Sequence, residues 1–110
     1  MKKFNAKDIP ITLAHNQVPR KALIKVGDLK SKIQTINDAY LEPGKGFTPH
    51  IHNDGEEIYY FLEGNGKMII NDKKFQVEKG NIVVVEIGEN HELKNTSAKK
   101  LRFITIRVLI

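Results

Sequence analysis

The sequence predicts an all-β fold, and two observations support this prediction. From residue 33 onward, short runs rich in β-branched and aromatic residues are separated by turn residues at intervals of about 8–12 residues, which is the spacing of a β-sandwich or β-barrel. No helical stretch lies between these turns. The chain of 110 residues suits one hydrophobic core, so we expect a single domain over residues 1–110.

The strands can be placed between the turn signals. Clusters of Gly, Asn, Asp and Pro predict turns at 43–46, 53–55, 64–66, 71–73, 79–81 and 88–90. The runs between them predict strands at 57–62, 67–70, 74–77 and 82–85, followed by a last strand at 101–110. Because only three residues separate the strands at 67–70 and 74–77, we expect these two to form a hairpin.

The first third of the chain has a weaker pattern. Leu23, Val26 and Ile33 could lie on one face of a helix over residues 20–33. The pair Gly27-Asp28 interrupts this helix, and the neighbouring pattern is that of strands. We therefore predict two short strands in this region instead of a helix.

Composition excludes several classes of protein. A hydrophobic fraction of 40% and a charged fraction of 28% are those of a globular chain, and the absence of cysteine excludes disulfides and thiolate metal sites. The longest apolar run, residues 58–62, is far too short to span a bilayer. Met1-Lys2-Lys3 resembles the start of a signal peptide, but polar residues follow where an apolar stretch is needed. We expect a cytoplasmic protein.

The formal net charge of +5 is concentrated near the N-terminus. Residues 1–32 contain eight Lys or Arg against two Asp, which gives +6 for this segment. The basic residues are scattered singly and lack the interleaved aromatic residues of a protein that binds single-stranded nucleic acid. We therefore interpret them as a solvated basic face and expect neither nucleic acid nor a membrane as a partner.

Three of the four histidines occur at strand–turn junctions together with an acidic pair. His50 and His52 are two residues apart, so they share one face of a strand. The turn at 53–55 then brings the pair Glu56-Glu57 back beside them, and His91 follows the turn at 88–90. Three imidazoles and one carboxylate suit a divalent Fe, Mn, Co, Ni, Cu or Zn ion and leave coordination positions open for water, substrate or dioxygen.

The spacing of these residues resembles the two motifs of the cupin family. The first motif covers residues 44–64 and the second covers residues 80–95, with fifteen residues between them; the matching positions are Gly44, His50, His52, Glu57 and Gly64, then Gly80, Gly88, His91 and Asn95. One position departs, because Glu86 stands where the family usually has Pro. The resemblance implies a double-stranded β-helix (jelly-roll) barrel that holds one divalent transition-metal ion with His50, His52, Glu57 and His91.

Neighbouring residues need to be distinguished from this ligand set. Glu56 and Glu57 point to opposite faces of a strand, and the family's six-residue spacing to Gly64 selects Glu57, which leaves Glu56 facing solvent. Tyr59 and Phe61 share the face of Glu57, and we expect both to fill the barrel. Contact between the Tyr59 hydroxyl and a substrate is the less favoured alternative. His15 has no partner in the sequence, so we do not expect it to be a ligand.

The family hosts many activities on one barrel, so the function stays open between three hypotheses. The first is a metal-dependent enzyme that performs isomerase, cyclase or lyase-type proton transfer on a small oxygenated metabolite, such as a sugar acid or keto acid. The second is an Fe-dependent dioxygenase. The third is a non-catalytic small-molecule-binding or sensor protein, which is less favoured because sensor cupins usually carry a fused DNA-binding helical domain.

The C-terminal segment predicts a homodimer. Residues 101–110 are apolar at both odd and even positions, so a strand with one face in the core leaves apolar side chains on the other. Monomeric proteins seldom expose such a patch. A second copy of the chain could cover it in a two-fold symmetric dimer, as small cupins commonly pair. The alternative is that the first twenty residues cover it within one chain.

Overall fold

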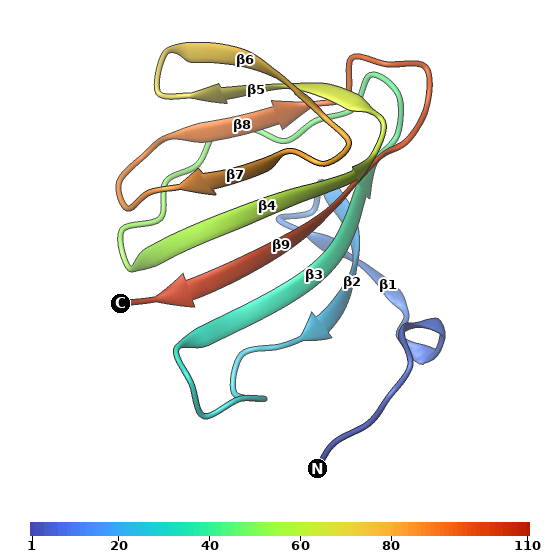
Figure 1. Cartoon of the computed structure of the whole chain (residues 1–110), viewed down its shortest axis with the longest axis vertical. Coiled ribbons are helices and arrows are strands. Elements are labelled where there is room, and N and C mark those ends of the chain that lie inside the picture. Colours follow the sequence, from blue (N-terminus) through green and yellow to red (C-terminus); the bar gives the residue numbers. More distant parts are fainter.

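The chain folds into two antiparallel β-sheets that face each other (Figure 1). The structure is a computed structural model that describes all 110 residues. The six-stranded sheet has the order β1-β2-β3-β9-β4-β7, with the bounds Ile11–Ala14, Val18–Ile24, Ile33–Leu41, Leu101–Leu109, Gly55–Glu63 and Ile82–Val85. The three-stranded sheet has the order β6-β5-β8, with the bounds Lys73–Glu78, Asn65–Ile70 and His91–Lys94. The one helix is the 3₁₀ turn Ala6–Asp8, and no helix reaches the length and hydrophobicity needed to cross a lipid bilayer.

The all-β prediction is confirmed, and the strands after residue 55 lie close to their predicted bounds. In the first third, the preference for strands over a helix is correct, but the prediction of two short strands within residues 20–33 is wrong. One strand, β2, ends at Ile24, and a turn follows in which Asp28 accepts a hydrogen bond from the Lys25 N–H and donates its own N–H to the Lys25 carbonyl. β1 was not predicted.

The interior of the large sheet changes from apolar to polar along its three central strands. Strand β9 pairs with β3 on one side and β4 on the other, so inward-facing residues form rows across the sheet. The rows at the C-terminal end of β3, which we call the lower rows, are apolar: Leu41 with Leu101, and Ala39 with Phe103 and Phe61. The rows nearer the N-terminal end of β3, which we call the upper rows, are polar: Asn37 with Thr105 and Tyr59, and Thr35 with Arg107 and Glu57. The lower rows belong to the hydrophobic core, and the upper rows form one side of a cavity.

Asn95, the last residue of the second motif, has a structural role. Its side chain is fully buried, and its amide nitrogen donates to the carbonyls of Leu41 and Lys99 at 2.8 and 2.7 Å. Its oxygen accepts from the backbone N–H and the hydroxyl of Ser97. A buried amide with every group paired holds its surroundings in place at no desolvation cost. Asn95 therefore fixes the loop between β8 and β9 against the end of β3.

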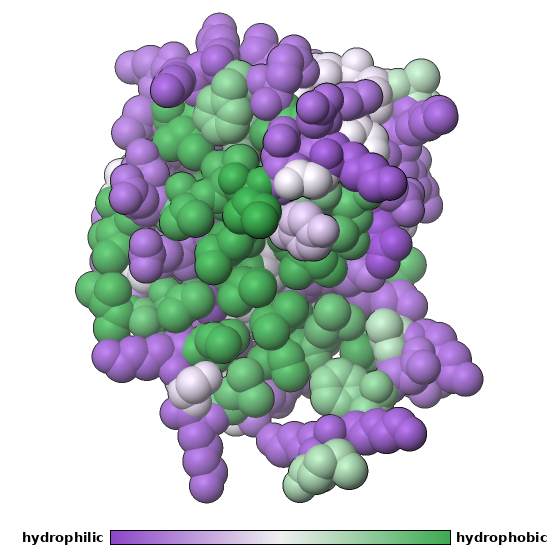
Figure 2. All heavy atoms as spheres, in the orientation of Figure 1, coloured by the Kyte–Doolittle hydropathy of each residue, from purple (hydrophilic) through white to green (hydrophobic).

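The outer face of the large sheet is apolar over its central strands (Figure 2). One row runs across five strands through residues paired side by side: Val84, Ile58, Ile106, Ile36 and Ile24. We call it the outer row. β1 and β2 extend the sheet beside β3. They leave Val84, Tyr60 and Ile82 of the outer face 47%, 45% and 66% exposed, so the N-terminal segment does not cover this face.

Candidate metal centre

The two motifs meet through their backbones. His50 lies in the segment between β3 and β4, and His91 begins β8. The two residues form an isolated antiparallel bridge, in which each N–H donates to the other's carbonyl at 3.1 and 3.0 Å. The His52 carbonyl accepts from the N–H of Gly88, in the turn before His91. These bonds bring the histidines of both motifs to one end of the barrel, as the sequence predicts.

The four predicted ligands converge. One nitrogen or oxygen atom from each of His50, His52, Glu57 and His91 lies within 4.8 Å of the others. The Glu57 Oε1 atom is 3.3 Å from His91 Nε2 and 3.8 Å from His52 Nε2. Two atoms that each lie about 2.1 Å from one ion are separated by roughly 3.0 Å at right angles and 4.2 Å when opposite. The two measured separations fall within this range, so the cluster could bind a metal ion.

In two of the histidine rings, the hydrogen bond made by Nδ1 determines which ring nitrogen keeps a free lone pair. His50 Nδ1 is 3.3 Å from the Thr48 carbonyl oxygen, and His91 Nδ1 is 3.2 Å from the Glu89 carbonyl oxygen. A carbonyl only accepts, so each Nδ1 carries the proton and each Nε2 has a free lone pair. His91 Nε2 and His52 Nε2 are buried without a hydrogen-bond partner in the protein. Buried acceptors of this kind fit the donor set of a divalent ion.

The turn before His91 is stabilised by the residue that departs from the family motif. The backbone N–H of Glu86 donates to the Glu89 carboxylate at 2.7 Å, and the Glu89 N–H donates to the Glu86 carbonyl at 3.1 Å. Proline has no N–H and could not make the first bond. The same Glu89 supplies the carbonyl that orients His91. With Glu86 in place of the family's proline, a hydrogen bond to Glu89 stabilises the turn, and His91 keeps its position in the cluster.

The environment of the cluster shifts the pKa values of its residues in the direction that favours cation binding. Burial, followed by repulsion from His91, lowers the pKa of His50 to about 4, and burial also lowers the pKa of His52. Burial alone would raise the pKa of Glu57, but the His91 ring beside it and the Tyr59 hydroxyl that donates to it outweigh burial, so its pKa is lowered. These shifts favour neutral imidazoles at His50 and His52 and an ionised carboxylate at Glu57, which are the protonation states that metal binding requires.

The strand β4 separates its side chains as the sequence predicts. Glu57, Tyr59 and Phe61 are buried on the inner face, and Glu56 is exposed on the outer face. The Tyr59 hydroxyl donates to Glu57 Oε1 at 2.8 Å. Burial and the neighbouring Glu57 charge raise the pKa of Tyr59 well above its ordinary value, so it stays protonated as a donor. Tyr59 fills the barrel and orients Glu57, and its hydroxyl is engaged there.

His15, which was not expected to be a ligand, lies beside the donor cluster, a position that the sequence did not predict. Its ring centroid lies 4.9 Å from that of His50, and it lines the same cavity. His15 and Asn16 have φ angles of 53° and 56°, in the left-handed region, and they lie at the centre of the three-residue turn between β1 and β2. The next residue, Gln17, exchanges hydrogen bonds with Thr48, two residues before His50. An Asn in a short turn between two β-prone runs was the signal that could have predicted this hairpin.

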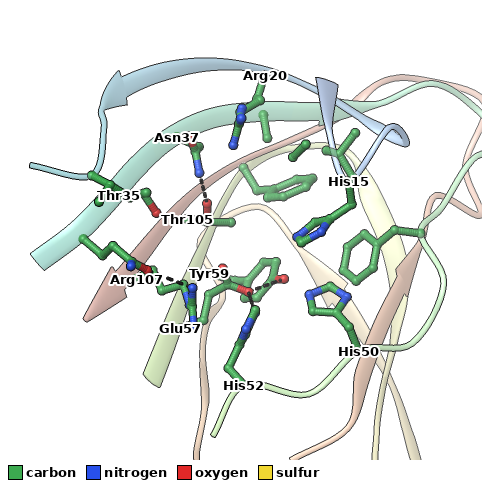
Figure 3. A pocket seen from close by; sticks show the side chains of 17 residues that line it. His15, Arg20, Thr35, Asn37, His50, His52, Glu57, Tyr59, Thr105 and Arg107 are labelled. Atoms are coloured by element: carbon green, nitrogen blue, oxygen red, sulfur yellow. Dashed lines mark hydrogen bonds and ion pairs between the residues drawn. The ribbon is translucent and has the colours of Figure 1, made fainter. Parts of the chain in front are cut away.

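A cavity of about 270 Å³ opens beside the cluster (Figure 3). His15 and His50 lie on one side, and the polar residues of β3 and β9 lie opposite, with Glu57 and Tyr59 between them. Two arginines also line the cavity. Arg107 donates to Gln34 and pairs with Asp54, and Arg20 comes from β2. The sequence pattern had singled out none of the polar residues Arg20, Thr35, Asn37, Thr105 and Arg107.

Comparison with known proteins identifies the family. The cupin domain family matches residues 38–107, more than half of the chain. An oxalate-binding protein of Thermotoga maritima is 33% identical over 94 residues, which cover 86% of this chain and 78% of that protein. The chain therefore belongs to the cupin family, and the resemblance predicted from its motifs is confirmed.

Two further similarities are more limited in what they show. An uncharacterized protein of Methanocaldococcus jannaschii is 32% identical over 71 residues, and the match spans 64% of this chain but only 57% of that protein. The crystal structure of a predicted oxalate decarboxylase from T. maritima superposes with a TM-score of 0.91 and covers 99% of this chain and 100% of that one. Its identity is 24%, so it establishes the fold alone, the double-stranded β-helix.

Metal content should depend on the inner-face residues only. We expect His52→Ala and His91→Ala to lower bound metal from about one ion per chain to below about 0.2, because three donors hold such an ion far less tightly than four. Glu57→Gln should lower it strongly as well. Glu56→Gln, the matched change on the outer face, should leave it unchanged. Elemental analysis of the purified variants provides the measurement, and equal losses in Glu56→Gln and Glu57→Gln would contradict the ligand assignment.

The metal-free protein should lose stability on acidification below pH 6.5. Unfolded His50 takes up a proton near its ordinary pKa of 6.5, whereas native His50 does so only near 4. Between these values the unfolded chain binds more protons, so the free energy of unfolding falls as the pH falls. Glu57 adds to the loss at lower pH, because its native pKa is below its ordinary value. Urea denaturation of wild type and His50→Asn across pH measures this, and equal slopes in the two proteins between pH 6.5 and 4 would refute it.

Proposed function

We propose that this cupin holds one divalent transition-metal ion with His50, His52, Glu57 and His91 and uses it to catalyse proton transfer on a small carboxylate metabolite. The observation that supports this best is the position of the donor cluster at one wall of a cavity whose opposite wall is polar and cationic. A metal site built only for stability would be closed on all sides. Here the cluster faces open space of molecular size.

The charges of the site favour an anionic ligand. Among the four ligands, Glu57 contributes one negative charge, and imidazoles bind a metal in their neutral form. A divalent ion held by them would leave the centre with a net charge of about +1. Arg20 and Arg107 add positive charge to the walls. The 33% identical relative from T. maritima is named as an oxalate-binding protein, and oxalate is a small carboxylate.

The protein's residues would orient the ligand and the metal. When bound, a divalent ion supplies Lewis-acid stabilisation of negative charge on a ligand oxygen. Thr48 and Glu89 hold the His50 and His91 rings in the required tautomer, and Tyr59 holds the Glu57 carboxylate. Polar residues of β3 and β9 form the cavity wall that a bound ligand would contact. These contacts leave the donor set little freedom to reorganise.

A non-catalytic carrier is a second candidate, favoured by one specific observation. The wall opposite the cluster consists of amide, hydroxyl and guanidinium groups, as in Asn37, Thr105 and Arg20. Such groups do not exchange protons near neutral pH. Apart from the cluster itself, His15 is the one imidazole that lines the cavity. A binding protein needs only recognition, which these groups supply.

Isotope exchange separates the two candidates. Metal-loaded protein in D₂O should exchange the C–H hydrogens on the carbon next to the carbonyl of keto acids or next to the carboxylate of hydroxy acids, because proton transfer there is reversible. Proton NMR measures the loss of the C–H signal. His91→Ala should abolish exchange, and Glu56→Gln should retain it. Binding of the acids by calorimetry without any exchange would reject catalysis in favour of a carrier.

We also propose that the chain forms a homodimer through the outer face of the large sheet. The outer row crosses five strands through paired residues, so the apolar face is broad. A two-fold symmetric partner would place the same apolar row against its copy. Figure 2 shows charged and polar residues around this area, the distribution of an apolar centre with a polar rim.

The dimer should dissociate when a charge enters the outer row. We expect wild type to sediment as a dimer at micromolar concentration and Ile58→Asp to sediment as a monomer, because a paired interface would bury the new carboxylate. Glu56→Gln, on the same outer face but polar already, should remain dimeric. Metal content should be unchanged in all three proteins, since Ile58 faces away from the cavity. A wild-type protein of monomer mass would overturn the proposal.

A further inference from the structure

We propose that the polar wall, the five cavity residues Arg20, Thr35, Asn37, Thr105 and Arg107, selects a hydroxylated acid with a second carboxylate, longer than oxalate. One carboxylate would lie at the metal cluster, a hydroxyl group would bind between Asn37 and Thr105, and the distal carboxylate would bind Arg20. This inference rests on the proposed function, because it assigns the ligand class of the same site. It comes from residues that the metal cluster does not use.

The centre of the polar wall is built to bind a hydroxyl group. Asn37 is 9% exposed, and its Nδ2 donates to Thr105 Oγ1 at 3.3 Å. Its Oδ1 is buried and accepts from no group of the protein. The Thr105 oxygen is occupied as an acceptor, so its own proton is available to donate. Both residues line the cavity, so the pair provides one unpaired acceptor and one free donor at its wall, which is the complement of a hydroxyl group.

This pair is placed where the barrel would otherwise be apolar. Asn37 and Thr105 lie one row above Ala39 and Phe103 in the register of β3 and β9. An unpaired buried amide oxygen destabilises a protein, whereas an apolar side chain in the same row would extend the core. A ligand hydroxyl would satisfy the oxygen. The cost in folding stability is explained if the row serves recognition.

Arg20 is the cation of this cavity without an acidic partner. Arg102 and Arg107 each pair with an aspartate, Asp38 and Asp54 respectively. Arg20 has no carboxylate within 4.0 Å, and its one hydrogen bond is a long contact of 3.5 Å from Nε to Thr12 Oγ1. It lies on the inner face of β2 opposite Ala39, and Figure 3 shows its side chain directed into the cavity. Its guanidinium can therefore receive a ligand carboxylate in bidentate geometry.

The size of the cavity agrees with a ligand longer than oxalate. Its volume of about 270 Å³ equals about nine waters at 30 Å³ each. Oxalate has six non-hydrogen atoms, and both its carboxylates would be occupied at the metal. The remaining space lies against the polar wall, where Asn37 and Arg20 are found. A longer chain would fill this space and reach both residues.

Four probe acids test the inference on the metal-loaded protein by titration calorimetry. Oxalate reports the metal end alone. The compound 3-hydroxyglutarate has two carboxylates and a central hydroxyl, glutarate lacks the hydroxyl, and 3-hydroxyvalerate lacks the distal carboxylate. We expect 3-hydroxyglutarate to bind at least about tenfold more tightly than glutarate or 3-hydroxyvalerate. Glutarate loses the hydroxyl contact, and 3-hydroxyvalerate loses the charge-assisted contact of the distal carboxylate.

Two variants assign the contacts to residues. Asn37→Leu should weaken 3-hydroxyglutarate about tenfold and leave glutarate and oxalate unchanged. Arg20→Met should weaken both dicarboxylates of five carbons about tenfold or more and leave 3-hydroxyvalerate unchanged. Lys21→Met is the matched control, because it removes the same charge from the opposite face of the same strand. It should change none of the affinities by more than about twofold, since exposed charges act weakly at a distance.

The outcomes distinguish this inference from the function on which it rests. If none of the acids binds, oxalate included, the proposed carboxylate function is wrong and the inference falls with it. If oxalate binds and the three five-carbon acids bind equally, the function stands and the inference is overturned. The inference is also overturned if Arg20→Met and Lys21→Met weaken binding equally, because that result shows general charge attraction. Metal content is measured in each variant, and it should match wild type.

Discussion

The register of β9 between β3 and β4 is the constraint on which the site depends. It aligns Thr35, Arg107 and Glu57 in one row, and Asn37, Thr105 and Tyr59 in the row below. A shift of β9 by one residue would turn Thr105 and Arg107 to the outer face. The apolar lower rows oppose such a shift, because Phe103 of the same strand is almost fully buried and would be exposed by it. Core packing therefore determines the chemistry at the other end of the same strands.

The same arrangement separates the stabilising half of the barrel from the functional half. In the upper half, His50, His52 and His91 approach one another, and buried nitrogens without partners make the metal-free cluster unfavourable. Their proximity and burial lower the pKa of His50, which keeps the cluster from protonating at neutral pH. Asn95 and the lower rows supply well-satisfied contacts elsewhere. A strained polar site is tolerated where a well-packed core supports it.

The sequence predicted the parts of the molecule that depend on local spacing. Turn residues marked the strands after residue 55, and the motif spacing brought together His50, His52, Glu57 and His91. It could not predict the polar wall, because Asn37 and Thr105 are 68 positions apart and meet only through strand pairing. An isolated Asn or Thr in a strand has no local signature that separates a cavity position from a surface one. His15 was missed for a related reason, since its contact with His50 depends on the β1–β2 hairpin.

The N-terminal hairpin adds a structural link between ligand recognition and the metal cluster. Arg20 and His15 both belong to β2 and its preceding turn, and Gln17 joins this turn to Thr48 by two hydrogen bonds, at 3.0 and 2.7 Å. Thr48 in turn orients His50 through its carbonyl. A ligand held by Arg20 would therefore contact a segment that is hydrogen-bonded to Thr48, the residue that orients His50. Gln17 and Thr48 thus link the hairpin that would bind the distal end of a ligand to the segment that orients a metal donor.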